Sequence, residues 1–353
     1  MQFLYRLLLG IVGALIAAEA LLRVLPVSTS TETGYYISPS IITYPAHHQF
    51  VMATGWNLSN AHHHRSNNYG FLSHRDFLPN ANAVALIGDS FVEANMLTEA
   101  ERLNTQLENK LGDNRPVYAF GGPGSSLLDY TERARFAQEH LGIRDFVFII
   151  ELGDVGQTLC GSGNIHGPCL DPVTFSLRSE ARPIKVSLAN KLLRQSALAQ
   201  YLFSQLRLKP GELQKKLFEN TNPEKTDTSV AASHKLIDQE DVQSVSVDHV
   251  VSAFLSSLPK NKEGRLVLVL DSYRDYLTNA NPNQTPVRDR FIQLARQAGI
   301  EVIDTKPIFY AFSHKTGLSL SVSPTDGHWN HLANGLVAAA IAARFGHIAI
   351  NQQ

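Results

Sequence analysis

A serine that directly follows a buried strand is the residue of this chain best placed for covalent chemistry. Residues 84–87 form a short apolar run that predicts a strand buried on both faces, and Gly88, Asp89 and Ser90 follow where that strand should end. In open α/β sheets, ligand sites lie just beyond the carboxyl ends of the strands. Ser90 is therefore a candidate nucleophile, and it needs a base and an anion-binding site to act.

A carboxylate and an imidazole near the other end of the chain could supply the base. Asp326 and His328 flank Gly327 in a segment expected to be a loop before an apolar helix. An imidazole held by a carboxylate can take the proton of a serine, so we expect His328 to face Ser90 across the top of the sheet. The alternative interpretation is a helix cap or a solvated surface pair. The presence of both motifs in one chain, separated by alternating strands and helices, favours catalysis.

The remaining elements predict an α/β fold that would hold these two motifs. Short apolar runs alternate with segments whose apolar residues recur at helical spacing. The predicted strands cover residues 84–87, 117–120, 146–151, 265–271 and 300–304. The predicted helices cover residues 99–111, 127–140, 247–258, 286–298 and 331–345.

These motifs resemble the SGNH (GDSL) hydrolase family. The resemblance rests on Gly88-Asp89-Ser90-Phe91, the glycine-rich turn at 121–126 and Asp326-x-His328, and it extends over about residues 65–346. It implies a three-layer α/β/α sandwich with a five-stranded parallel sheet of the flavodoxin-like kind. It also implies ester hydrolysis or acyl transfer through an acyl-serine, without a metal or organic cofactor. The Asp-x-His-Trp form is similar to that of the alginate O-acetylation proteins.

The resemblance also suggests where an oxyanion would bind. It implies the backbone amides of Ser90 and Gly121 as donors. The family has a Gly-x-Asn-Asp element after the third strand, where this chain has Gly153 or Leu152 in place of the Asn. Loss of one such donor costs on the order of 3 kcal/mol of transition-state stabilisation, so either Gln157 or another side chain substitutes, or the activity is weak. The residues expected around a possible substrate cleft are Asp89, Gly153, Asp154, Gln157 and Trp329.

The first 26 residues predict a signal anchor or a signal peptide. Arg6 precedes an uninterrupted apolar run over residues 7–18. Ala18-Glu19-Ala20 offers a small-x-small cleavage site, but the apolar pattern continues beyond it, which favours an anchor. We therefore expect a single-pass inner-membrane protein with its catalytic domain in the periplasm, or a secreted protein if the segment is cleaved. Residues 27–80 are expected to form an extended lead-in segment before a catalytic domain at 81–346.

Residues 157–245 are predicted to be an insertion after the third strand. A long amphipathic helix is expected over 186–208, as core or as a lid, and a polar mobile loop over 219–243. Cys160 and Cys169 predict a local disulfide in an oxidising compartment. Metal binding, with His166 between them, is the competing interpretation. A second histidine-rich stretch, residues 62–64, is expected to be a solvated loop.

Composition limits the kind of partner. The 353-residue chain has a formal net charge of -1 and no basic cluster, so we expect no nucleic-acid partner. An extracytoplasmic enzyme of this kind would take an acylated carbohydrate or an acyl donor as substrate. A polysaccharide-export protein or a membrane acyltransferase is a possible protein partner. Three functions remain open: an esterase, an acyltransferase on the same scaffold, and a catalytically weak glycan-binding protein.

Overall fold

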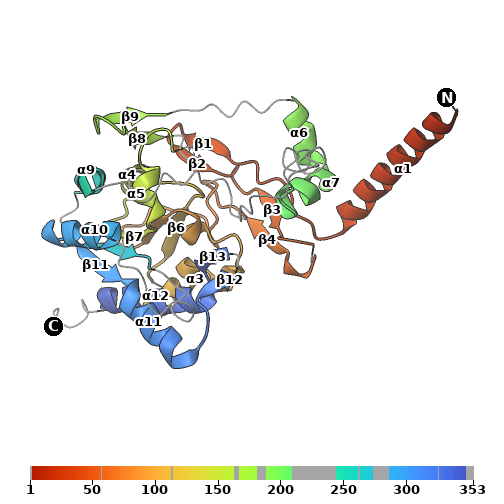
Figure 1. Cartoon of the computed structure of the whole chain (residues 1–353). Helices are drawn as coiled ribbons and strands as arrows, with labels where there is room; N and C mark the ends of the chain where they lie inside the picture. The colour runs from red at the N-terminus through yellow and green to blue at the C-terminus, as the bar shows by residue number, and fades with distance from the viewer. Residues whose placement is uncertain are drawn as a thin grey trace, which may run out of the picture. The chain divides into compact units, whose positions relative to one another are not determined.

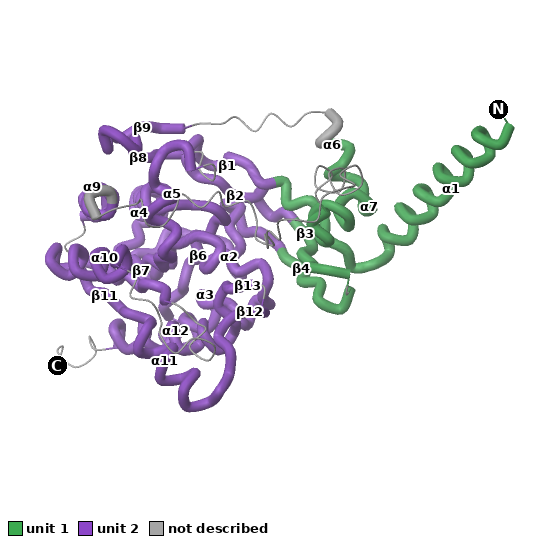
Figure 2. The backbone as a smooth tube through the Cα atoms, in the orientation of Figure 1, with its two compact units in different colours: residues 1–32, 49–64, 185–241 green, residues 33–48, 65–184, 242–353 purple. Residues whose placement is uncertain are grey.

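The computed structural model divides the chain into two compact units (Figures 1 and 2). Unit 1 comprises residues 1–32, 49–64 and 185–241, and unit 2 comprises residues 33–48, 65–184 and 242–353. The residues that the structure describes are 2–56, 58–112, 114–162, 167–180, 188–208, 244–260, 263–272, 286–324 and 326–346. The predicted loop at 219–243, the second part of the predicted insertion and His166 lie outside these ranges.

Unit 2 is built on a five-stranded parallel sheet, as the sequence predicts. Its strands lie in the order β11-β10-β7-β5-β6, and every neighbouring pair is parallel. Numbered along the chain, this is the flavodoxin-like order 2-1-3-4-5, which reverses direction between β5 and β7. The strands are β5 Val84–Gly88, β6 Val117–Gly121, β7 Asp145–Ile150, β10 Leu266–Leu270 and β11 Glu301–Asp304.

Helices cover both faces of this sheet, which completes the three-layer arrangement (Figure 1). Side chains of a strand alternate between faces, so Ala85 and Ile87 pack in one core. Val84 and Leu86 pack in the other. The first face is covered by α4 Leu127–Leu141, α9 Ser244–Ser257 and α10 Pro286–Gln297. The second is covered by α3 Leu103–Leu111, α11 Thr305–Thr316 and α12 His331–Gly346.

The sequence predicts one continuous helix over 99–111, but the structure has two helical pieces there. A 3-10 turn, η2 Glu99–Glu101, is separated from α3 by Arg102, whose ψ of 151° is extended. Thr98 and Glu101 form a capping box that closes the short turn. The Arg102 side chain is buried and donates to the carbonyl oxygens of Ala94 and Leu97. These bonds hold the connection between the two helical pieces.

Several short elements of unit 2 carry no clear signal in the sequence. The segment with Asp326 and His328 is a strand, paired antiparallel with a neighbour, rather than the expected loop. The short elements are β1 Gly34–Ser38, β2 Ile41–Thr43, α2 Ser90–Glu93, α5 Gly153–Gln157, β8 Pro168–Leu170, β9 Leu177–Ser179, β12 Ser321–Ser323 and β13 Asp326–Trp329.

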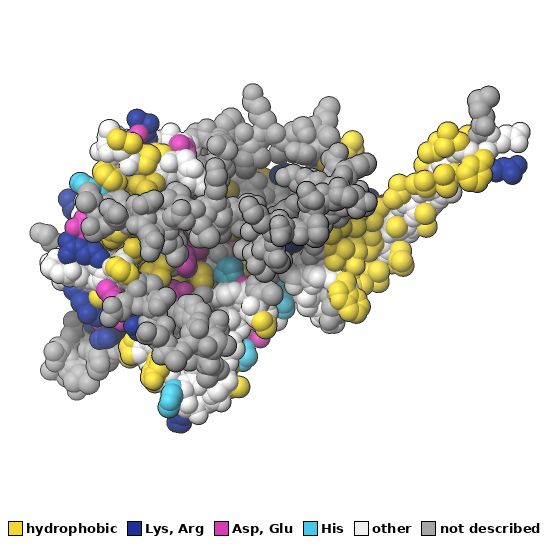
Figure 3. All heavy atoms as spheres, viewed as in Figure 1, with side chains coloured by type: hydrophobic (Ala, Val, Ile, Leu, Met, Phe, Trp, Pro, Cys, Tyr) yellow, Lys and Arg dark blue, Asp and Glu magenta, His cyan; other side chains and the backbone are white. Residues whose placement is uncertain are grey.

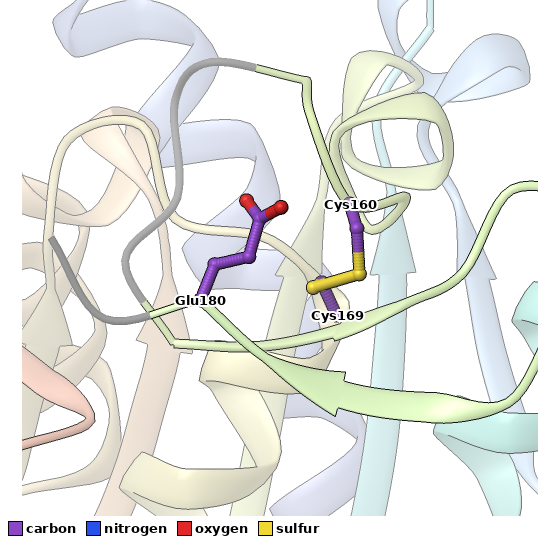
Figure 4. A group of neighbouring side chains, drawn as sticks. All are labelled: Cys160, Cys169 and Glu180. Atoms are coloured by element: carbon purple, nitrogen blue, oxygen red, sulfur yellow. A yellow bond between two sulfur atoms is a disulfide. The ribbon is translucent and has the colours of Figure 1, made fainter.

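The predicted disulfide is present in unit 2. Cys160 and Cys169 are joined, and Glu180 lies beside them (Figure 4). The three side chains are close enough to share an ion, but each sulfur is already bonded to the other and is no longer a thiolate ligand. Glu180 accepts a hydrogen bond from the backbone N–H of Gly161 at 3.3 Å. These contacts favour a structural crosslink over the metal interpretation.

Unit 1 corrects two expectations. His64, expected in a solvated loop, lies in a strand, is buried, and has its ring centroid 5.3 Å from that of Phe50. The helix expected over 186–208 is broken at Ser196, which has an extended backbone and caps the piece that follows. The elements of this unit are α1 Gln2–Val24, β3 Gln49–Met52, η1 Leu58–Asn60, β4 His62–Arg65, α6 Leu188–Gln195, α7 Ala197–Ala199 and the π-helix η3 Gln200–Gln205.

Helix α1 is long and apolar enough to cross a membrane. It has 23 residues, and its most apolar 18-residue stretch has a mean hydropathy of 2.1, with only 6% of that stretch buried. Hydrophobic side chains cover it along its length (Figure 3). Near its C-terminal end, the Glu19 carboxylate accepts hydrogen bonds from Ser196 Oγ at 2.8 Å, Ala197 N at 3.1 Å and Leu198 N at 2.9 Å. Within unit 1, Glu19 therefore caps the start of α7.

Candidate active site

The turn after β5 positions Ser90 at the carboxyl end of that strand, beside the point where the strand order reverses. Asp89 precedes helix α2, and its side chain accepts a hydrogen bond from Phe91 N at 2.9 Å. This N-cap fixes the first turn of α2, so Ser90 begins a helix that packs on β5 and β6. The Ser90 side chain is only partly buried, while its two neighbours in the chain, Asp89 and Phe91, are buried.

Ser90, His328 and Asp326 lie in one hydrogen-bonded chain. Ser90 Oγ is 2.8 Å from His328 Nε2, and His328 Nδ1 is 2.6 Å from an Asp326 carboxylate oxygen. That oxygen also accepts the backbone N–H of His328 at 3.1 Å. The two side chains of the pair are 30% and 26% exposed, so solvent or a substrate can reach them. In this geometry Nδ1 donates to the carboxylate and Nε2 can accept the serine proton.

Aromatic side chains pack against the His328 imidazole. The Phe91 and His328 ring centroids are 4.9 Å apart, and Trp329 meets Phe91 edge to face at 5.3 Å. The Trp329 indole is 1% exposed and donates to an Asp271 carboxylate oxygen at 2.8 Å. Trp329 was expected at a substrate cleft, and its burial corrects that expectation. Its contacts instead fasten β13 to the end of β10.

Gly121 lies beside the nucleophile turn, as the resemblance implies. It is the last residue of β6 and is paired in register with Gly88. A Cβ at Gly121 would lie 2.3 Å from Glu93 N, so α2 can approach this strand only because the residue is glycine. Its role as an oxyanion donor stays a prediction. The next residue, Gly122, donates its N–H to Asp89 O at 3.3 Å and so ties the two turns together.

The segment after β7 differs from the expected cleft wall. Asp154 is fully buried, and one carboxylate oxygen accepts from Tyr130 Oη at 2.9 Å and from Glu151 N at 2.8 Å. Asp154 therefore holds the turn after β7 against α4 and does not line an open cleft. A Cβ at Gly153 would lie 2.5 Å from Glu151 Oε2 and 3.2 Å from Gln157 Nε2. Those two side chains occupy the space that a side chain at position 153 would need.

Buried carboxyl groups cluster under the site. Burial raises the pKa of Asp89 above its usual value, and burial together with the nearby charges of Asp89 and Glu151 raises the pKa of Asp154 well above its usual value. Burial also raises the pKa of Asp129 to about 6. Glu93, on α2, accepts a hydrogen bond from Tyr44 Oη, and burial raises its pKa from 4.5 to about 7. Burial thus shifts each of these acids towards its neutral form.

These shifts predict that the fold loses stability as the pH rises towards 8. A carboxyl group whose pKa is raised by folding stabilises the fold below its unfolded pKa, and this stabilisation is lost as the pH passes the folded value. For Glu93 the window runs from 4.5 to about 7, and the loss is on the order of 3 kcal/mol. Glu93→Gln should flatten the dependence, which denaturation by urea between pH 5 and 8 would measure. The exposed Glu139→Gln serves as control, and equal slopes in both variants would contradict the prediction.

Three further residues at the site were not predicted from the sequence. Asp271 directly follows the fourth strand and accepts the indole N–H of Trp329, but a carboxylate after a strand is common and gives no specific signal. Arg133 and Tyr130 lie on α4 and are fully buried. An arginine among the apolar positions of a predicted helix is the one signal that could have been noticed, because an unpaired buried guanidinium is costly.

Comparisons with known proteins found similar solved structures only. No protein-family profile and no curated protein matches the chain. A member of the lipolytic G-D-S-L family from Veillonella parvula is 13% identical, with a TM-score of 0.38 over 75% of this chain and 99% of that one. A carbohydrate acetylesterase from Sinorhizobium meliloti is 10% identical, with a TM-score of 0.36 over 75% and 99%. A lipase/acylhydrolase from Enterococcus faecalis is 13% identical, with a TM-score of 0.39 over 77% and 99%.

Proposed function

We propose that this chain is a serine hydrolase of the SGNH type that cleaves acyl esters through an acyl-serine. The observation that carries the proposal is the continuous bonding of Ser90, His328 and Asp326, with 2.8 Å and 2.6 Å between the reacting atoms. Ser90 and His328 are 238 positions apart in the chain, so no local turn explains their meeting. A solvated surface pair or a helix cap would not place Nε2 on a serine hydroxyl.

The geometry suggests the following sequence of steps. Ser90 Oγ attacks the ester carbonyl while His328 Nε2 takes its proton, and Asp326 holds the imidazolium that forms. Backbone amides of Ser90 and Gly121 would stabilise the tetrahedral anion. The proton on Nε2 then passes to the leaving alcohol, which leaves an acyl-serine. A water, or a sugar hydroxyl in an acyltransferase, attacks this ester by the reverse route. The two outcomes differ only in this second nucleophile.

The substrate class is part of the proposal. We infer an acyl group, with acetyl as the first to try, on a carbohydrate outside the cytoplasm. Two features support an extracytoplasmic site: the apolar helix α1 and the disulfide between Cys160 and Cys169. Neither feature selects a particular sugar.

An acyl-trapping experiment tests the function. The full chain in detergent is mixed with p-nitrophenyl acetate, and intact mass and peptide mapping follow any acetyl adduct. Steady turnover with a small steady-state adduct on Ser90 supports an esterase. A stoichiometric adduct on Ser90 that clears only after a glycan is added supports an acyltransferase. A folded protein with neither turnover nor an adduct would overturn the proposal and favour a glycan-binding role.

We also propose that α1 remains attached as an anchor. Glu19 lies within the alternative cleavage site, and cleavage after Ala20 would remove the carboxylate that caps α7. The freed N–H groups at the start of α7 would then have to be satisfied by water. We therefore expect protein extracted from membranes to retain residues 1–20 in its intact mass. Glu19→Ala should speed proteolysis within 188–208. Stable accumulation of a chain that starts after Ala20 would contradict the anchor.

A further inference from the structure

A buried arginine lies under both turns that would form the oxyanion site. Arg133, on α4, is 1% exposed, and its Nη1 donates to the carbonyl oxygen of Gly88 at 2.9 Å. Its Nη2 donates to Ser125 Oγ, and that hydroxyl donates to Gly122 O at 2.7 Å. Gly88 is two residues before Ser90. One guanidinium therefore contacts the nucleophile turn directly and the glycine turn through a single hydroxyl.

The glycine turn rests on the guanidinium itself. A Cβ at Gly122 would lie 2.2 Å from Arg133 Nη2, so any larger residue would have to displace the arginine or the turn. The direct bond from Gly122 N to Asp89 O closes the same arrangement from the other side. The two turns and the guanidinium thus form one connected unit, and a shift in any of them would move the other two.

The Arg133 guanidinium lies among buried carboxyl groups. Burial lowers the pKa of the guanidinium, and the carboxyl groups of Asp129, Asp89 and Glu93 favour its charged form. Its Nε has no hydrogen-bond partner among the described residues. A lysine could not replace this arrangement, because its single ammonium nitrogen cannot reach two separate acceptors in the fixed geometry of a planar guanidinium.

We propose that Arg133 is a positioning residue that clamps the nucleophile turn to the glycine turn, so that the amides of both turns point at one oxyanion. The inference rests on the proposed function, because the anion that it serves is the tetrahedral intermediate on Ser90. Arg133 touches neither substrate nor Ser90 in this scheme. It acts through Gly88 O and Ser125 Oγ.

The test compares Arg133→Lys and Arg133→Met with Arg135→Met in the full chain. Arg135 is on the same helix, and its side chain is 57% exposed. Rates are expressed per Ser90 titrated with a fluorophosphonate. We expect both Arg133 variants to lower kcat by about 100-fold with KM changed by less than about 3-fold, because misplaced donors weaken the transition state rather than substrate binding. The affinity for an arylboronic acid, which forms a tetrahedral anion on serine, should fall in parallel.

Ser125→Ala provides a second variant that is expected to fold. It removes only the link through Nη2, so we expect about a 10-fold loss in kcat and in boronate affinity. A merely structural arginine would lower the melting temperature and leave both quantities per titrated site unchanged, which would overturn the proposal. The proposal also fails if Arg133→Met does not fold while Arg133→Lys and Ser125→Ala keep wild-type boronate affinity. If the folded wild-type chain shows neither labelling nor turnover that depends on Ser90, the proposed function itself is refuted. The role of Arg133 then falls as well, because it rests on that function.

Discussion

Replacing Ser90 with alanine is expected to lower ester turnover by about 10⁴-fold or more, because no acyl-serine can then form. The fold should survive, since the described contacts of the hydroxyl are to His328 at 2.8 Å and to Asp89 at 3.4 Å. Both partners have other hydrogen bonds. The measurement is kcat/KM for an acetyl ester, with circular dichroism as the check on folding.

An exposed serine provides the control for Ser90→Ala. Ser256 is exposed on α9, on the far side of the sheet from α2, so Ser256→Ala should keep wild-type turnover. A Ser90→Ala variant that turns over ester as fast as Ser256→Ala would place the nucleophile elsewhere and refute the proposed mechanism.

Asp326→Asn is expected to lower kcat by roughly 10³- to 10⁴-fold at neutral pH. In the native chain, one carboxylate oxygen accepts both the side-chain Nδ1–H and the backbone N–H of His328, at 2.6 Å and 3.1 Å. An amide can turn its NH₂ towards Nδ1, which leaves the proton on Nε2, where it cannot accept from Ser90. The imidazolium formed during reaction also loses its counter-charge.

Kinetics can separate this effect from a general loss of structure. Substrate binding does not need the right imidazole tautomer, so KM should change little while kcat falls. Asp289→Asn alters a 59% exposed carboxylate and serves as the matched control. Equal kcat values in the two variants would show that Asp326 does not orient the base.

The sheet was predictable because its signals are local. Residues 84–87 and 146–151 are mostly uninterrupted apolar runs, and a parallel strand buried on both faces requires such a run. The place of Ser90 just after a strand was predictable for a related reason, because the apolar run that ends before Gly88 marks the strand end. The pairing of Ser90 with His328 needed both motifs to be interpreted together, and neither is informative alone.

The remaining features were not predictable because distant residues create them. The start of α7 has a local cap in Ser196, but the second cap comes from Glu19, which is 177 positions away. Strand β13 contains Asp326-Gly327-His328-Trp329, which has no alternation of apolar residues, and it exists because β12 pairs with it. The Arg133 contacts join two turns that only the finished sheet brings together.

The way the chain builds unit 1 has a consequence for its synthesis. Ser28 N donates to the side chain of Gln205, so the segment after α1 finds this partner only when 177 further residues have been made. Unit 1 also includes residues 49–64, and three strands of the unit 2 sheet, β5, β6 and β7, are translated between these residues and Gln205. Contacts of such long sequence separation form slowly, and domains completed late leave apolar surface exposed in the meantime. Unit 1 should therefore become resistant to protease only late in translation, and a ribosome paused before Gln205 would hold a chain whose N-terminal segments still lack their partners.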